Sequence, residues 1–333
     1  MVNILNLGTS GSDNGDSSLQ KVHKAKTAYL NIVEEFSALC ESYVNNEPAP
    51  LAIVENSITE IIDLIRSEDD YICAMPSLPY SFVTHRITGN TSPFITVHGV
   101  NMMIYALQIS NSLEVPDSRL KLIAHGALFH NIGLLNAEES LLNKERPLDK
   151  RSQKAIDDLI LSFGEVLDHF NPPSKENLEV IISLIAKGEE LPTMMDQLSD
   201  EIHQYAMIIH ICKVYEALTH QKTYGKKFSP SEAMKHLRSQ MKDYFHPEII
   251  RLFFNELSIY PLGSYVKLSS GETAKIVEVN KKFIMRPTVL IVLDENQKLK
   301  KPMVNVNLRQ KPTLYIKESL MEDDIYSEFV DAF

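Results

Sequence analysis

The fold is decided by residues 121–135, which read KLIAHGALFHNIGLL. Apolar side chains at positions 120, 123, 124, 127 and 128 follow the i, i+3, i+4, i+7, i+8 spacing of a helix that buries one face. One further turn places Asn131 on that face and His130 at its edge, and Gly133 is predicted to break the helix just after them. We therefore expect a buried helix that ends in an adjacent histidine and asparagine.

Two further stretches flank this helix: HGVNMMIYAL at 98–107 and YAMIIHICKVYEALTHQKTYGKKFSPSEAMKHL at 205–237. In this order the three stretches resemble the HD-GYP branch of the HD phosphohydrolases. In that family the first gives a histidine, the second reads His-Asp-Ile-Gly-Lys, and the third reads Ala-Asp-Val-Phe-Asp-Ala-Leu-Thr, then Arg-Pro-Tyr-Arg. The resemblance covers about residues 94 to 310 and implies a helical domain in which two or three metal ions activate water.

The resemblance also assigns the family's metal-site positions, residue by residue. His98 matches the first ligand, and His130 matches the histidine of the His-Asp pair. Asn131 stands where the bridging aspartate of the family stands, Leu134 where its lysine stands, and Lys213 where its last aspartate ligand stands. We interpret His98, His130, Asn131 and Lys213 as vestigial metal-site positions.

Other ligands of the family are missing from the sequence. No histidine occurs in 131–168 or in 170–202, so the family's His-His-Glu run has no counterpart, and Gly-Tyr-Pro is absent. Asn131 brings no negative charge, and the Lys213 ammonium would repel a cation. We therefore predict no catalytic residues, no metal and no cofactor, where the family would use iron, manganese or other divalent metals. His125 and His210 are interpreted as packed polar residues on helix surfaces; the alternative is that one of them helps to hold a single metal.

Lys213 should face the core near His98, His130 and Asn131, where an unpaired ammonium is costly. We expect its nitrogen to take the place of the metals and to donate to the Asn131 oxygen and to a neutral imidazole. Glu216, three residues later on the same helix, is expected to balance its charge.

The segment 222–225 reads Lys-Thr-Tyr-Gly at the place of Arg-Pro-Tyr-Arg, which in the family helps to hold the phosphates of cyclic di-GMP. Three lysines within six residues can attract an anion. The candidate phosphate-binding residues are Lys222, Tyr224, Lys226 and Lys227. The alternative is a solvated basic loop before a helix.

The rest of the chain predicts a mainly α protein. Helices are expected at about 19–45 and 50–67, from about 94, and at about 150–169, 175–187 and 200–219, with an irregular stretch at 68–93. Ser229 and Pro247 should open two more helices. From Tyr260 the apolar residues alternate, which predicts a small antiparallel sheet followed by an acidic tail that docks as a short helix.

These elements divide the chain into four parts. A flexible lead-in (1–18) precedes an N-terminal helical region (19–93), whose helical hairpin is interpreted as a dimerisation or packing surface rather than a sensor. The degenerate HD-GYP-like helical domain (94–259) follows, and the β-subdomain with its acidic tail (260–333) ends the chain.

The composition narrows the possible functions and the cellular compartment of the protein. The net charge of −11 over 333 residues argues against a general nucleic-acid binder. Three cysteines without a Cys-x-x-Cys pair indicate a reducing compartment, and no apolar run is long enough for a membrane span. We expect a cytoplasmic bacterial protein.

Three functions are weighed. We favour a non-catalytic signalling or scaffold protein that binds a partner protein, of unknown identity, and a nucleotide only weakly. The alternatives are a metal-dependent cyclic di-GMP phosphodiesterase and a cyclic di-GMP receptor without turnover. A homodimer is compatible with each of them.

Overall fold

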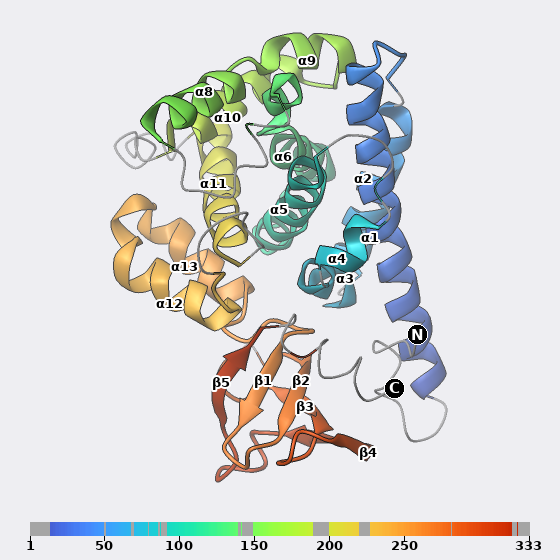
Figure 1. Cartoon of the computed structure of the whole chain (residues 1–333), viewed down its shortest axis with the longest axis vertical. Helices are drawn as coiled ribbons and strands as arrows, with labels where there is room; N and C mark the ends of the chain where they lie inside the picture. The colour runs from blue at the N-terminus through green and yellow to red at the C-terminus, as the bar shows by residue number, and fades with distance from the viewer. Residues whose placement is uncertain are drawn as a thin grey trace.

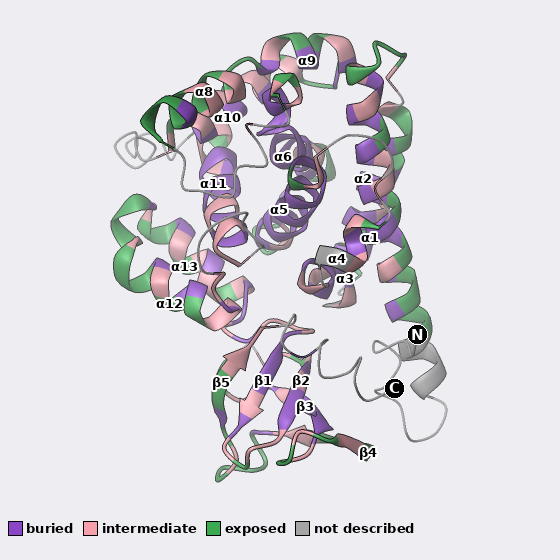
Figure 2. Cartoon of the chain, viewed as in Figure 1, coloured by how far each residue is buried: buried purple, intermediate pink, exposed green. Residues whose placement is uncertain are grey.

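Three buried helices form the centre of the structure: α5 (Pro93–Asn111), α6 (Asp117–Phe129) and α11 (Glu201–Thr219). Every residue from Ile95 to Leu107 of α5 is buried, because α1, α2, α6, α11 and α13 all pack against this helix. Figure 2 shows the burial concentrated in these three helices, with the exposed positions on the outer ones. A helix that is apolar all round belongs inside a core, as α5 does.

The computed structural model describes residues 14–49, 51–67, 70–78, 80–85, 87, 92–138, 141, 149–188, 200–219, 227–280, 282–321 and 325. The outer helical elements are α1 (Asn14–Val44), α2 (Leu51–Arg66), α3 (Asp70–Ala74), η2 (Met75–Ser77), α4 (Tyr80–Thr84), η3 (Ile132–Asn136), α8 (Lys150–Ile160), α9 (Phe163–Phe170), α10 (Lys175–Lys187), α12 (Pro230–Gln240), η5 (Lys242–Tyr244) and α13 (Pro247–Glu256). Within the described residues, no helix combines the length and apolar character that a bilayer crossing requires.

The N-terminal hairpin of α1 and α2 lies along one side of the helical body (Figure 1). Its buried side chains, such as Tyr29, Phe36 and Ile58, belong to the same hydrophobic cluster as those of α5 and α6. Arg66 at the end of α2 donates to the Val115 carbonyl at 2.6 Å and thereby ties the hairpin to the α5–α6 junction. The hairpin is therefore part of the core of the helical domain.

The C-terminal subdomain is a five-stranded antiparallel sheet in the order β4-β3-β2-β1-β5. The strands are β1 (Tyr265–Leu268), β2 (Thr273–Glu278), β3 (Thr288–Leu293), β4 (Leu299–Asn307) and β5 (Ile316–Leu320). Alternate residues of β3 enter two different clusters, Val289 and Ile291 on one face and Leu290 and Val292 on the other. The prediction of a mainly α fold with a small antiparallel β-subdomain is confirmed.

Several local predictions differ from the structure. Helix α1 already begins at Asn14, inside the predicted lead-in, and residues 1–13 lie outside the described part. The stretch 68–93, predicted to be irregular, contains α3, η2 and α4. Pro76 lies in the first turn of η2, where a proline starts a helical turn instead of breaking one.

The predicted helix at 150–169 is two helices, α8 and α9, separated by a turn at Leu161 and Ser162. Ser174, just before α10, has a left-handed backbone (φ 57°) and makes no side-chain cap. Ile53 in α2 is 50% exposed. By contrast, the capping box of Ser229 and Glu232 at the start of α12 is confirmed.

The acidic tail agrees in part with the prediction of a docked helix. Its first residues, Glu318 to Leu320, belong to strand β5 and pair with β1. Further on, Ile325 is helical and is buried against Tyr265 and Leu290 on one face of the sheet. Residues 322–324 and 326–333 lie outside the described part.

Gly133 does not end helix α6, which already ends at Phe129. It lies within η3, where a Cβ atom would come within 2.1 Å of the Leu159 carbonyl oxygen and 3.0 Å of the Ile160 carbonyl oxygen. Both oxygens belong to backbone of α8, which cannot rotate away as a side chain can. The glycine is therefore required by the close approach of η3 to α8.

We predict that Gly133→Ala lowers the free energy of unfolding by roughly 2–3 kcal/mol, the usual cost of forcing atoms into a filled space. Gly164→Ala in α9 is the matched control, since a Cβ atom there would meet nothing within 4 Å. That variant should be neutral or stabilising by at most about 1 kcal/mol. Urea titration of both variants measures the difference, and equal effects would refute the packing explanation.

Candidate functional site

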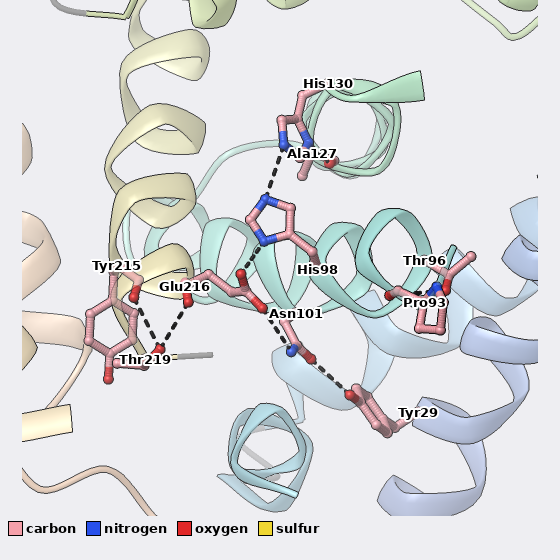
Figure 3. Close-up of polar contacts among 10 residues, drawn as sticks. All are labelled: Tyr29, Pro93, Thr96, His98, Asn101, Ala127, His130, Tyr215, Glu216 and Thr219. Atoms are coloured by element: carbon pink, nitrogen blue, oxygen red, sulfur yellow. Dashed lines mark hydrogen bonds and ion pairs between the residues drawn. The ribbon is translucent and has the colours of Figure 1, made fainter. Parts of the chain in front are cut away.

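The site is built around two buried imidazoles, His98 on α5 and His130 directly after α6 (Figure 3). Their Nε2 atoms lie 3.2 Å apart, and the ring centroids are separated by 5.0 Å with an interplanar angle of 55°. The side chains are only 4% and 1% exposed. The structure therefore brings together two of the four residues that the sequence assigned to the site.

The other nitrogen of each imidazole is held by the protein. His130 Nδ1 lies 2.8 Å from the Ala127 carbonyl oxygen, which can only accept, so this nitrogen carries a proton. His98 Nδ1 pairs with the Glu216 carboxylate on α11. A ligating histidine characteristically gives its second nitrogen to a carboxylate or a carbonyl in this way.

These partners determine what must lie between the two Nε2 atoms. His130 Nε2 offers a lone pair, because its proton is on Nδ1. A 3.2 Å contact between two bare lone pairs is repulsive, so either a proton or a cation must lie between them. We assign a proton to His98 Nε2, which then donates to His130, while a second proton is shared between His98 Nδ1 and Glu216. Burial, the neighbouring His98 and Lys213 hold the pKa of His130 well below its usual value, which keeps this ring a neutral acceptor.

The polar contacts continue into the N-terminal hairpin. Glu216 Oε1 accepts from Asn101 Nδ2 at 3.3 Å, and Asn101 Oδ1 accepts from the Tyr29 hydroxyl at 2.8 Å. Phe94 stacks on His98 with ring centroids 5.0 Å apart and an interplanar angle of 10°. One hydrogen-bonded chain, from His130 through His98, Glu216 and Asn101 to Tyr29, thus links α6, α5, α11 and α1 (Figure 3). We call these five residues the polar chain.

Lys213 lies near this chain but not in the predicted arrangement. Its charge lowers the pKa of His130, and burial lowers the pKa of Lys213 itself, while Asp157 acts in the opposite direction. The Asn131 Oδ1 atom is buried and has no hydrogen-bond partner within the described part of the chain. The prediction that Lys213 donates to Asn131 is therefore wrong. Glu216 pairs with His98 and Asn101, and the acidic group that acts on Lys213 is Asp157, so the expected charge balance by Glu216 stays a prediction.

His125 and His210, predicted on helix surfaces, are both buried, at 2% and 8% exposure. His125 Nε2 lies 2.7 Å from Glu55 Oε1 on α2, an ion pair without hydrogen-bond alignment, and this contact lowers the pKa of Glu55. Burial, aided by Lys213, lowers the pKa of His210 to about 4. Helices α6 and α11 are covered on several sides, so these polar positions are packed against neighbouring helices.

Most of the lysine segment lies outside the described residues, which include Lys227 but not Lys222, Tyr224 or Lys226. Lys227 lines a cavity of about 50 Å³ between the helical body and the sheet. Tyr105, Tyr215 and Thr219 are among the other residues of its wall. This volume is large enough to hold water. The phosphate-binding assignment stays a prediction.

The metal centre that the family resemblance implies fits these residues only in part. The paired Nε2 atoms, with their outer partners on Nδ1, have the arrangement of two ligands of one ion. Asn131 Oδ1 is a buried oxygen without a hydrogen-bond partner in the described part of the chain, and Lys213 brings a positive charge near the pair. No group of three or more histidine, cysteine, aspartate or glutamate side chains that could hold a metal occurs among the described residues. These residues by themselves therefore do not fit a cluster of two or three metals.

Comparison with known families agrees with this architecture. Residues 83–249 match the HD domain model, and residues 265–328 match a KOW domain associated with HD domains. The first match covers half of the chain, so the chain belongs to the HD domain family. The resemblance to HD phosphohydrolases is confirmed; the loss of activity stays a prediction.

Three curated relatives match at low identity. The chain is 24% identical over 224 residues to a cyclic di-GMP phosphodiesterase of Pseudomonas aeruginosa, with 64% of this chain and 51% of the relative covered. It is 22% identical over 198 residues to a cyclic di-GMP phosphodiesterase of Borreliella burgdorferi (59% and 51% covered). It is also 22% identical over 191 residues to a 3'3'-cGAMP-specific phosphodiesterase of Vibrio cholerae (56% and 41% covered). The chain thus spans about half or less of these relatives, and no solved structure matches it significantly.

Two members of the polar chain were missed by reasoning from the sequence. Asn101 lies three residues after His98 and so on the same helix face, a spacing that could have indicated it. Tyr29 has no such signal, because its contact spans 72 residues and depends on how the hairpin packs.

We predict that Glu216→Ala lowers the free energy of unfolding by roughly 3–5 kcal/mol, because it leaves buried partners of the polar chain unpaired. Glu201→Ala on the same helix is the control. Its partner Arg119 is 3.1 Å away but both side chains are exposed, so the loss should be at most about 1 kcal/mol. Glu216→Gln, which can still bond to His98 and Asn101, should lose less than Glu216→Ala. Similar losses for Glu216→Ala and Glu201→Ala in urea titrations would contradict the proposed role.

Proposed function

We propose that this chain is a non-catalytic HD-domain protein of cyclic-dinucleotide signalling, whose helical domain serves to bind a partner protein. The observation that carries this proposal is the use of all four imidazole nitrogens of His98 and His130 inside the protein. An imidazole whose Nε2 is bonded to another imidazole is not free to ligate. With a proton between the two Nε2 atoms the site needs no ion, and this supports the proposal.

Electrostatics around the pair supports the same proposal. Hydrolysis by HD enzymes needs metal ions that hold and activate water, and carboxylates normally neutralise their charge. A unit charge near a divalent cation in a buried site makes a large contribution to the stability of the bound ion, because the effective dielectric there is low. Lys213 gives this contribution the unfavourable sign, and Asn131 offers no charge to offset it.

The partner-protein part of the proposal rests on the connection between site and hairpin. The Tyr29 hydroxyl joins α1 to the polar chain, so the geometry of the former catalytic region and that of the hairpin are coupled. A domain that keeps its fold but has no catalytic activity is suited to present a binding surface to a partner protein. Binding of a cyclic dinucleotide is a weaker second role, supported only by Lys227 at the cavity.

The principal alternative is a metal-dependent cyclic-dinucleotide phosphodiesterase. It is favoured by the names of the three relatives and by the 3.2 Å separation of the two Nε2 atoms, which also suits two ligands of one ion. With a metal bound, His98 and His130 would hold the ion, which would supply an activated water; Asn131 could add a neutral oxygen.

Metal analysis distinguishes the non-catalytic protein from the phosphodiesterase. After dialysis, the full chain should contain well under one equivalent of iron, manganese or zinc, and should hydrolyse neither bis-(p-nitrophenyl) phosphate nor cyclic di-GMP. The double variant Asn131→Asp/Lys213→Asp restores the two carboxylates, yet should remain inactive because the His-His-Glu ligands of the family are still missing. Retention of one or more equivalents together with turnover would instead establish the enzyme.

A further inference from the structure

The loop between β2 and β3 carries three consecutive exposed apolar side chains. Phe283, Ile284 and Met285 are 45%, 38% and 50% exposed. No other run of three large hydrophobic residues is exposed in the described part of the chain. A scattered exposed hydrophobic residue needs no explanation, but a contiguous group at the tip of a hairpin indicates an interaction surface.

The backbone of this loop is ordered by its own hydrogen bonds. Asn280 Oδ1 accepts from the backbone amides of Lys282 and Phe283 at 3.1 and 3.0 Å. The Arg286 amide donates to the Phe283 carbonyl at 2.7 Å, which closes a tight turn around Ile284 and Met285. The apolar side chains thus stand exposed on a turn closed by hydrogen bonds.

Positive charges flank the apolar tip. The Arg309 guanidinium lies 4.7 Å from the centre of the Phe283 ring, and Lys282 is exposed beside it. Arg286 is anchored to the Leu314 carbonyl at 2.7 Å. The sheet, residues 265–320, contains eleven lysines and arginines against five aspartates and glutamates, and the tail at 321–333 adds five more acidic residues. The sheet itself is thus basic, on a chain with a net charge of −11.

We propose that residues 282–286, with Arg309, form a membrane-docking tip that inserts Phe283, Ile284 and Met285 into the surface of a bilayer rich in anionic lipids. The combination of a small apolar insertion with surrounding basic residues is what such a surface binds. Docking on a bilayer requires no helix that spans it.

Two other partners suit the tip less well. A specific protein interface buries about 800 Å² on each side, far more than three side chains at a hairpin tip provide. Single-stranded nucleic acid stacks its bases on open aromatic rings, but Arg309 covers one face of Phe283, and Ile284 and Met285 offer no stacking surface.

The acidic residue nearest to the tip in the sequence is Glu278, at the base of the hairpin, where it accepts from the Thr288 hydroxyl.

Flotation of the full chain with lipid vesicles tests the proposal. The protein should float with vesicles of phosphatidylcholine and phosphatidylglycerol, and much less with phosphatidylcholine alone. Added salt should weaken the binding, since screening reduces the basic contribution. The triple variant Phe283→Ser/Ile284→Ser/Met285→Ser should bind anionic vesicles at least about tenfold more weakly, because each lost apolar side chain removes favourable transfer energy.

The matched control replaces three equally exposed apolar residues on the helical body, Val44→Ser/Leu161→Ser/Val180→Ser, and should bind like the unmodified chain. Both variants change only exposed positions, and a circular dichroism melt checks that they fold. The proposal is overturned if the chain ignores anionic vesicles, if the tip variant floats as well as the control, or if only a single-stranded RNA probe is bound.

Discussion

The contact between His98 Nε2 and His130 Nε2 is the interaction on which the arrangement of the site depends. Two buried lone pairs cannot face each other, so a proton or an ion must fill the contact. The single ring proton of His130 is on Nδ1, where it bonds to the Ala127 carbonyl. The proton between the two rings therefore belongs to His98 Nε2. That requirement in turn orients Glu216, and through Asn101 it orients Tyr29.

Under the proposed non-catalytic function, the same geometry keeps the polar groups of the site paired without metal ions. Metal ions in such sites neutralise converging polar groups, and their removal would leave unpaired atoms in a core. Here the His98 imidazole donates to the His130 imidazole, and the carboxylate of Glu216 accepts hydrogen bonds from both His98 and Asn101. Asn131 Oδ1, next to His130 in the sequence, has no hydrogen-bond partner in the described part of the chain.

Much of the fold could be predicted because it is encoded locally. Helices α5 and α11, the capping box at Ser229 and the alternation of β1 to β3 each follow from the spacing of nearby residues. The pairing of His98 with His130 followed from the family resemblance, not from spacing. By contrast, the acceptor of His98, the contact of Asn101 with Tyr29 and the crowding of Gly133 by α8 depend on tertiary packing. Lys213 was correctly expected near His130, but its partners could not be read from one helix.

The position of the imidazole protons tests this account most directly. Long-range proton–nitrogen NMR correlation of the histidine-labelled chain reports which ring nitrogens of His98 and His130 carry hydrogen. We predict a protonated Nε2 on His98 and an unprotonated Nε2 with a protonated Nδ1 on His130, with no change after treatment with a chelator. Two unprotonated Nε2 atoms whose signals shift when the chelator is added would contradict the account and show a metal between the rings.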